Sequence, residues 1–187
     1  SGQLGNGSTV QSNVPVAVTA TGALAGKVIA SVSSGSAYAL ALSDNGEIFG
    51  WGIAGRRGDG SNSNSTTPVA VSSFGSGSKV ATDLVAGYNH AFIAAVDGMI
   101  YSFGSNAKGA LGNGSLFDSL VATPMLKYGS VAGKDIMLGT AGSTFSVLVD
   151  TDGGIHTWGQ NDFGQLGATA VSTALANPTP LISRALA

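Results

Sequence analysis

The chain has 187 residues, and 43% of them are hydrophobic, which is enough for a substantial core. Only 10% are charged and the formal net charge is −2, so the chain offers no long-range attraction for nucleic acid or for an acidic membrane. It contains no cysteine, which excludes a disulfide framework and a thiolate metal site but leaves the compartment unknown. It shows no signal peptide and no transmembrane run.

The first residues look like the end of a repeating unit. The chain starts inside a motif, Gly2-Gln3-Leu4-Gly5, that recurs further along, and we expect it to be a piece of a longer protein. Residues 1–14 are predicted as the tail of a loop, in which glycine and asparagine tolerate positive φ. Residues 15–18 are predicted as a short strand that begins with proline. Residues 1–18 are therefore interpreted as the end of a preceding repeat.

A complete repeat of four strands is predicted over residues 19–71. Apolar and small residues alternate with a strand period, and Asp44-Asn45-Gly46 is a hairpin-turn signal between the second and third strands. A polar loop then precedes the fourth strand. The strands are expected at residues 28–33, 38–42, 47–51 and 67–71.

The same order recurs in repeats predicted over residues 72–126 and 127–187. In each, a glycine ends the first strand, an Asp-Gly pair turns the second strand into the third, and a long polar loop follows. A helical period is absent, although residues 168–176 could form one helical turn. The strands are expected at 79–86, 90–96, 99–103 and 121–126, and then at 134–139, 145–149, 155–158 and 180–183.

The spacing of one motif gives the repeat length. Its leading glycines, Gly2, Gly55, Gly109 and Gly164, are 53, 54 and 55 residues apart. Four-stranded antiparallel units of this kind are typical of β-propeller blades, whereas helical repeat arrays have other elements or periods. We therefore predict an all-β partial β-propeller, with three complete blades and the outer strand of a fourth, as an open arc of a larger ring. A β-sandwich also fits the number of strands but would not explain the recurrence.

The repeated residues resemble a known family. The stretch from Trp158-Gly159-Gln160-Asn161 to Gly164-Gln165-Leu166-Gly167 is similar to the Trp-Gly-x-Asn-x-x-Gly-Gln-Leu-Gly signature of the regulator of chromosome condensation family. Residues 26–52 look like one full repeat of that family, and Gly87-Tyr88-Asn89-His90 resembles its Gly-x-x-His segment. The signature positions in this chain are Trp51, Gly52, Phe103, Gly104, Trp158, Gly159, Gly164, Leu166 and Gly167.

The resemblance covers almost the whole chain and implies a seven-bladed propeller whose remaining blades are missing from this chain. An open arc leaves sheet flanks and edges that invite association. Two features depart from the family pattern. The Gly-x-x-His position holds His90 in one repeat but Tyr38 and Phe145 in the others, and the first loop reads Gly55-Arg56-Arg57-Gly58 without the asparagine segment.

No convergent set of catalytic or metal-binding residues stands out. His90 and His156 have no paired metal-ligand spacing, and we expect His90 to pack or hydrogen-bond and His156 to be half-exposed. No serine lies in a Gly-x-Ser-x-Gly elbow, and most carboxylates fall in turns. Residues 22–27 and 129–134 have three residues between their glycines where a phosphate loop needs four. The sequence therefore predicts no enzyme, no cofactor and no metal.

The long loops over residues 52–66, 104–119 and 159–178 are the predicted recognition elements, because loops on a rigid framework usually carry recognition. Asn-x-Ser/Thr patterns at Asn6, Asn64 and Asn113 mark exposed loops whether or not they are glycosylated. A loop phenylalanine could equally tuck against its own blade. The candidate partner-facing residues are Arg56, Arg57, Lys108, Leu116, Phe117, Asp162 and Phe163.

The sequence favours a non-enzymatic scaffold that binds another protein, with neither nucleic acid nor membrane as its partner. The resemblance implies one alternative, guanine-nucleotide exchange on a small GTPase, and a further one, inhibition of a secreted enzyme. In each case Trp51 and Trp158 are expected to be largely buried, between blades or against their own loops.

Overall fold

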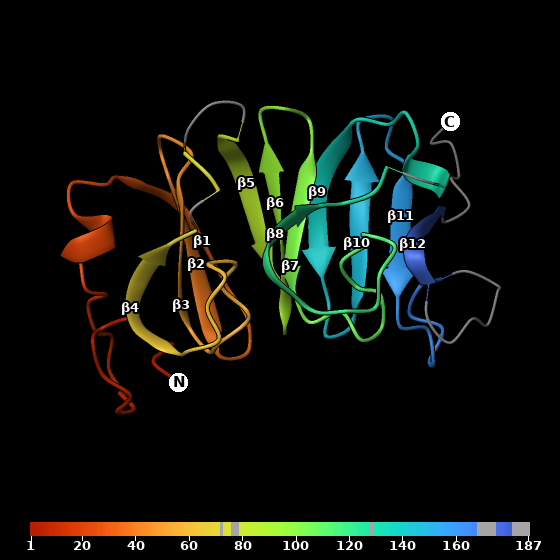
Figure 1. Ribbon diagram of the computed structural model, residues 1–187. Helices are drawn as coiled ribbons and strands as arrows, with labels where there is room; N and C mark the ends of the chain where they lie inside the picture. Colours follow the sequence, from red (N-terminus) through yellow and green to blue (C-terminus); the bar gives the residue numbers. More distant parts are fainter. Residues whose placement is uncertain (72, 76–78, 128, 168–174, 181–187) are drawn as a thin grey trace.

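The chain forms three four-stranded antiparallel sheets, blades 1 to 3, in the computed structural model, which describes residues 1–71, 73–75, 79–127, 129–167 and 175–180 (Figure 1). Each strand pairs with its neighbours in chain order. Blade 1 contains β1 (Ile29–Ser34), β2 (Tyr38–Ser43), β3 (Ile48–Gly52) and β4 (Ser65–Ala70); blade 2 contains β5 (Ala81–Ala86), β6 (His90–Ala95), β7 (Ile100–Gly104) and β8 (Ser119–Pro124); blade 3 contains β9 (Ile136–Ala141), β10 (Phe145–Asp150), β11 (Ile155–Gly159) and β12 (Leu175–Pro180).

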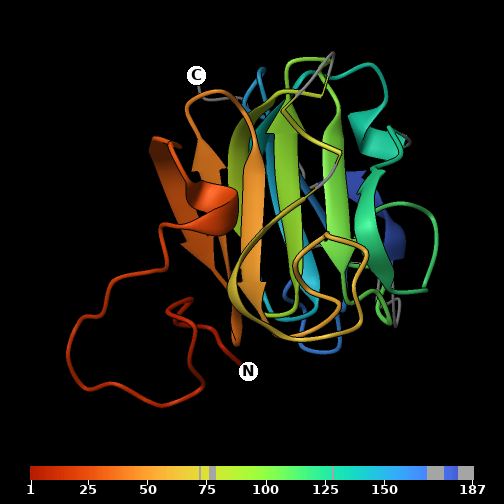
Figure 2. The same ribbon diagram turned by 60° about the vertical axis from the view of Figure 1, so that its left-hand side comes forward.

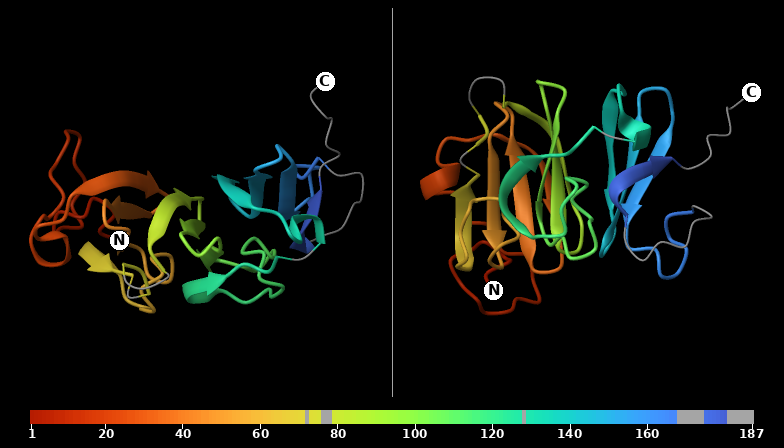
Figure 3. Two further views of the ribbon diagram at one scale, coloured as in Figure 1. Left: turned by 90° about the horizontal axis from the view of Figure 1, so that it is seen from above. Right: turned by 45° about the vertical axis from the view of Figure 1, so that its right-hand side comes forward.

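The blades stand side by side along an arc, in the order of the chain (Figure 3). The first strands of successive blades contact one another, β1 with β5 and β5 with β9. Hairpin turns close each blade at one end. The long loops after β3 and β7 lie at the other end, the lower end in Figure 1, and so do residues 160–167 after β11. This arrangement is that of a partial propeller.

Apolar side chains from both faces of the middle blade form the cores between blades. Along β6 the side chains alternate, so that Phe92 faces blade 3 and Ile93 faces blade 1. Both are fully buried, because the sheet is covered on each side. The first core includes Leu40, Ile48, Leu84, Ile93 and Phe103, and the second includes Phe92, Met125, Val131, Leu148 and Trp158.

The two end faces of the arc differ in how they are covered. On blade 1, Phe49 and Trp51 pack against Val18 and Leu24 of the N-terminal segment, which runs alongside the blade as an extended loop (Figure 2). A 3₁₀ turn, η1 (Gly22–Leu24), lies in that segment. On blade 3, the corresponding end face is partly exposed, with Phe145, Val147 and Val149 half-buried.

Eleven of the twelve strands predicted for the three repeats are confirmed with ends shifted by no more than two residues, and the prediction for the last strand is wrong. There β12 occupies 175–180 instead of 180–183, and residues 181–183 lie outside the described residues. Of the predicted helical turn, residues 168–174 lie outside the described residues and the last two belong to β12.

The predicted strand over residues 15–18 is wrong, because this segment pairs with no other strand. In a blade of this order an outer strand pairs with the third strand of its own sheet, and that strand is not in this chain.

Besides η1, a second 3₁₀ turn, η2 (Gly129–Val131), lies between blades 2 and 3. Over the described ranges, no helix is long and apolar enough to cross a membrane.

Candidate functional site

The signature motif holds successive blades together. The aromatic residue at the end of each third strand packs on the closing glycine of the preceding loop. A Cβ on Gly112 would lie 2.9 Å from the Trp158 indole nitrogen, and one on Gly58 would lie 3.0 Å from the Phe103 ring. Trp158 is fully buried, and its indole N–H donates to the Ala110 carbonyl at 2.8 Å. The prediction that the tryptophans are buried is confirmed; the partner of Trp158 is the loop of the preceding blade, and the partner of Trp51 is the N-terminal segment.

The glycine after each of these aromatic residues is needed because the chain passes close to the hairpin beside it. Gly104 has φ of 109°, and a Cβ there would lie 2.4 Å from the Asn89 carbonyl oxygen. Gly52 and Gly159 have the same conformation and a similar approach. The Trp-Gly pair is therefore a packing element.

The second long loop is organised around the buried side chain of Asn106. Its Oδ1 accepts the Leu111 amide at 2.9 Å, and its Nδ2 donates to the carbonyls of Ser115 at 2.9 Å and Phe117 at 3.1 Å. In the third loop, Asn161 accepts the Leu166 amide in the same way. These bonds fix the loop backbone, so the side chains that the loops expose are held on a rigid support.

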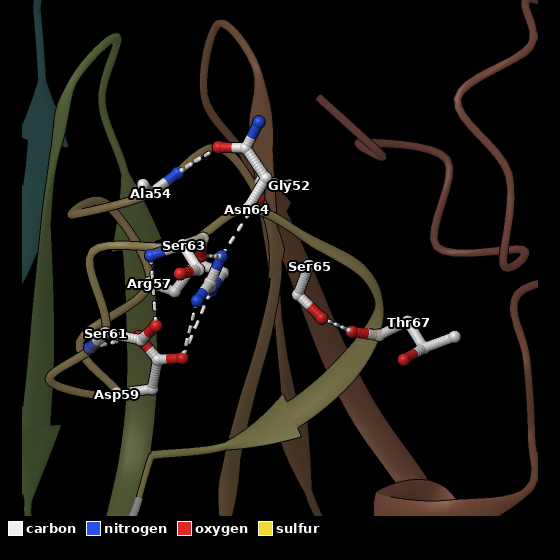
Figure 4. A network of polar contacts seen from close by, with 9 residues as sticks. All are labelled: Gly52, Ala54, Arg57, Asp59, Ser61, Ser63, Asn64, Ser65 and Thr67. Carbon is white, nitrogen blue, oxygen red and sulfur yellow. Dashed lines mark hydrogen bonds and ion pairs between the residues drawn. The ribbon is translucent and has the colours of Figure 1, made fainter.

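The first loop lacks this asparagine, and its backbone is held instead by the side chain of Arg57 (Figure 4). Arg57 Nη1 donates to the carbonyls of Gly52 at 3.0 Å and Ser63 at 2.7 Å, and Nη2 pairs with Asp59 at 2.7 Å. Only 2% of Arg57 is exposed. The prediction that Arg57 faces a partner is therefore wrong, because its side chain fills the position that Leu111 and Leu166 fill in the other repeats.

The first loop also covers the outer edge of blade 2. Asp59 bridges to Val121 of β8, and the Gly60 amide donates to the Leu120 carbonyl at 2.9 Å. Arg56 reaches Asp118 of the second loop at 3.1 Å, so it forms an ion pair between the two loops. An exposed strand edge is thereby partly closed to unwanted pairing.

The remaining candidates differ in exposure. Phe117 is 83% and Phe163 is 91% exposed, and Leu116 is 51% exposed, so neither phenylalanine tucks against its own blade. Asp162 is exposed and accepts a hydrogen bond from Gln160 at 2.6 Å, whereas Lys108 is half-buried. All five lie at the loop end of the arc, which we call the loop face: residues 35–37, 53–64, 87–89, 105–118, 142–144 and 160–167.

Tyr88 was not singled out from the sequence, yet it is 56% exposed on the loop face. It lies in the short connection between β5 and β6, and equivalent connections in blades 1 and 3 join it in lining an open recess. Hydrogen bonds from Ser36 to the Tyr88 carbonyl at 3.0 Å and from Tyr88 to the Gly142 carbonyl at 3.1 Å join the three blades there. Its position within the Gly-x-x-His segment was the sequence feature that could have identified Tyr88 as a loop-face residue.

His90 is a buried structural residue. Its Nε2 lies 2.9 Å from Ser146 Oγ, whose own proton goes to the Ala110 carbonyl at 2.8 Å. His90 Nε2 is therefore the donor, and Nδ1 is left without a partner. Burial, together with the positive charge of Arg56, lowers the pKa of His90 to about 4. The imidazole is neutral at ordinary pH.

His156 is buried, so the prediction that it is half-exposed is wrong. Its Nε2 contacts Asp150 at 3.0 Å and its Nδ1 contacts Ser130 at 2.8 Å. The hydrogen bond from His156 lowers the pKa of Asp150 below its usual range. The set resembles a hydrolase triad in composition, but both His156 and Asp150 are closed to a substrate. Its effect is to fasten the η2 connection to blade 3.

Two of the Asn-x-Ser patterns have a structural explanation. Asn6 Oδ1 accepts the Ser8 amide at 3.1 Å, and Asn113 Oδ1 accepts the Ser115 amide at 3.1 Å. Asp59 does the same for Ser61 at 3.2 Å in the first loop. The pattern is thus a turn that the N-terminal segment shares with the first two long loops. Within the described part of the chain, no group of three or more His, Asp or Glu side chains is placed to hold a metal ion.

Comparison with known proteins agrees with the repeat geometry. Two models of the regulator of chromosome condensation (RCC1) repeat match, one at residues 29–58, 81–110 and 140–165 and the other at residues 97–149. The ultraviolet-B receptor UVR8 of Arabidopsis thaliana is 31% identical over 89% of this chain, which spans only 36% of the receptor's length.

Solved structures show the same fold. Human WBSCR16 superposes with a TM-score of 0.67 at 25% identity, over 82% of this chain and 39% of that one. Prp20p of Saccharomyces cerevisiae superposes with a TM-score of 0.66 at 18% identity, over 84% of this chain and 39% of that one. One repeat model matches in all three repeats and the second matches residues 97–149, so the chain belongs to the regulator of chromosome condensation (RCC1) repeat family.

Proposed function

We propose that the chain is part of a non-enzymatic scaffold whose loop face binds another protein. The observation that carries this proposal is the pair of highly exposed aromatic side chains, Phe117 and Phe163, on loops with a fixed backbone. A large apolar side chain on a rigid loop loses little conformational freedom on binding, so much of its burial energy is available for affinity.

The charges on the loop face indicate the chemistry of the partner. Arg57 is paired with Asp59, and Arg56 is paired with Asp118. Of the described charged residues on this face, only Lys108 and Asp162 are outside an ion pair, and they have opposite signs. We therefore expect an apolar, weakly charged contact surface on the partner and an affinity that changes little with salt.

Paired variants of the full-length protein test this proposal. Phe117→Ser and Phe163→Ser remove the exposed aromatics, and Val96→Ser is the control, because Val96 is 57% exposed in the turn at the opposite end of blade 2. Immobilised proteins are compared by quantitative mass spectrometry of what they capture. The proposal expects a defined set of captured proteins to be lost with both loop-face variants and kept with the control; capture that survives both variants contradicts it.

Nucleotide exchange is the competing function. The structure of Prp20p was described together with its binding to Gsp1p and histones, but at 18% identity that likeness concerns the fold alone. Release of a fluorescent guanine nucleotide from a panel of small GTPases separates the two functions. Acceleration by the full-length protein would replace passive scaffolding with exchange, whereas unchanged release supports the scaffold. A panel of secreted hydrolases, assayed in parallel, tests the inhibitor alternative by loss of their activity.

A further inference from the structure

The chain contains three asparagine–glycine pairs, Asn6-Gly7, Asn45-Gly46 and Asn113-Gly114. Glycine has no Cβ, so the backbone nitrogen after the asparagine is poorly shielded and can reach the carbon of the side-chain amide. The pairs at Asn6 and Asn113 have the same local sequence, Leu-Gly-Asn-Gly-Ser. Any difference in their reactivity therefore comes from the fold.

The nucleophilic nitrogen is occupied in two of the three pairs. The Gly7 amide donates to the Thr66 carbonyl at 2.9 Å, and the Gly46 amide donates to the Ser43 carbonyl at 3.0 Å. The Gly114 amide has no acceptor among the described residues, and Gly114 is exposed. An amide that already donates a hydrogen bond must give it up before its nitrogen can attack, so Gly114 has the most available nitrogen.

The carbon that would be attacked, Cγ of the asparagine side chain, is also more strongly polarised at Asn113 than at Asn6. Its Oδ1 accepts two hydrogen bonds, from the Ser115 amide and from Asn106 Nδ2, each at 3.1 Å. Two donors on this oxygen polarise the side-chain carbonyl and stabilise the negative charge that develops there during attack. The bond to Ser115 also folds the side chain forward over Gly114. Asn6 Oδ1 accepts from Ser8 alone among the described residues.

We propose that Asn113 is a site of spontaneous deamidation, which the fold selects from the three asparagine–glycine pairs. The Gly114 nitrogen forms a bond to Cγ of Asn113 and gives up its proton as the Cγ–Nδ2 bond breaks, so that ammonia leaves and a succinimide ring remains. Water then opens the ring. Cleavage at Cγ gives aspartate, and cleavage at the backbone carbonyl carbon gives isoaspartate.

The two products have different consequences for the second loop. Aspartate keeps an acceptor for Ser115, and Asp59 makes the equivalent bond in the first loop, so this product fits. Isoaspartate adds a methylene to the backbone beside Asn106 and displaces the bonds that hold Ser115 and Phe117. If the loop face binds as proposed above, isoaspartate at this position weakens binding as the protein ages.

Peptide mapping of the purified protein tests the site independently of any partner. The protein is kept at physiological temperature and mildly alkaline pH, and the amide-to-acid mass change is followed at each asparagine. We expect conversion at Asn113 to be severalfold faster than at Asn6 in the folded protein, and the two rates to become equal in urea. Equal rates in the folded protein, or faster conversion at Asn6, would overturn the proposal.

Discussion

The indole nitrogen of Trp158 lies 2.8 Å from the carbonyl oxygen of Ala110, in the loop of the preceding blade. The same carbonyl accepts the hydroxyl of Ser146 at 2.8 Å, so both of its lone pairs are used by blade 3. Trp51 repeats the contact with the Gln3 carbonyl at 3.0 Å. The Trp-Gly motif, the most recognisable one in the sequence, therefore forms a contact between blades.

Removing the Trp158 side chain should strongly weaken the contact between blades 2 and 3. Trp158→Ala is expected to destabilise the protein by roughly 3–5 kcal/mol, because it leaves a cavity in a closed core. Trp158→Phe keeps a ring, as Phe103 does in blade 2, and should lose about 1 kcal/mol for the hydrogen bond. Urea unfolding measures both changes. An alanine variant with an unchanged midpoint would show that Trp158 is not a packing residue.

The effects of substituting Arg57 and Asp59 on protein stability should depend on each other. Arg57→Leu restores the residue found at Leu111 and Leu166 but leaves the carboxylate of Asp59 without its partner, in a side chain that is only 10% exposed. We expect this variant to lose about 3 kcal/mol, as broken buried pairs do. The double variant Arg57→Leu/Asp59→Asn carries the residues of the second loop at these two positions and should recover the part of the loss that comes from the unpaired carboxylate. If the double variant is as unstable as the single one, the account of this loop is wrong.

His90 should make the folded protein sensitive to acid. The folded protein resists protonation of His90 until about pH 4, whereas the unfolded chain takes up this proton near pH 6.5. The contribution of His90 to stability is therefore complete above pH 6.5 and is lost as the pH falls towards 4, by about 3 kcal/mol in all. The measurement is the unfolding free energy as a function of pH.

His90→Tyr is the matched variant for this titration, because Tyr38 occupies the equivalent position and donates to the carbonyls of Gly87 at 3.0 Å and His90 at 2.7 Å. The variant should have a flatter profile between pH 6.5 and 4, whatever its absolute stability. Asp150 has a lowered pKa, so its contribution to stability is lost only in stronger acid, and the loss should be equal in both proteins. Identical slopes in this window would rule out His90 as the titrating group.

Two glycines with positive φ allow the cost of backbone strain to be compared with the cost of a steric clash. A Cβ on Gly98, at φ of 73°, meets nothing within 4 Å, whereas one on Gly104, at φ of 109°, meets the Asn89 carbonyl. Gly98→Ala should lose about 1 kcal/mol from strain alone, and Gly104→Ala should lose clearly more. Thermal unfolding of the two variants gives the comparison. Equal losses would mean that the approach at Gly104 relaxes freely.

The strands and the blade signature could be predicted from the sequence because both depend on local patterns. Period-two alternation and turn glycines act within a few residues, and they placed β6 and β7 to within a residue or two. The strand predicted at residues 15–18 failed for the opposite reason, since a strand forms only if its partner is present. Pattern alone could not show that residues 15–18 have no partner strand among the described residues.

The site residues were harder to predict because their exposure depends on neighbouring blades. Arg57 looked like half of an exposed basic pair, yet its alignment with Leu111 and Leu166 was the available sign of burial. His156 was misjudged because its partner Asp150 is reached across the hairpin, where Leu148 pairs with His156. The contact of Arg56 with Asp118 joins loops 62 residues apart and follows only from the packing of blade on blade.

Site-specific photo-crosslinking tests the central claim most directly. A photoreactive phenylalanine analogue replaces Phe117, Phe163 or, as a control, Val96 in the full-length protein, which is then irradiated in its native cells. The account predicts that Phe117 and Phe163 yield a discrete crosslinked partner and that Val96 yields none. A partner that crosslinks from position 96 and from neither loop position would show that binding occurs at the opposite end of the blades.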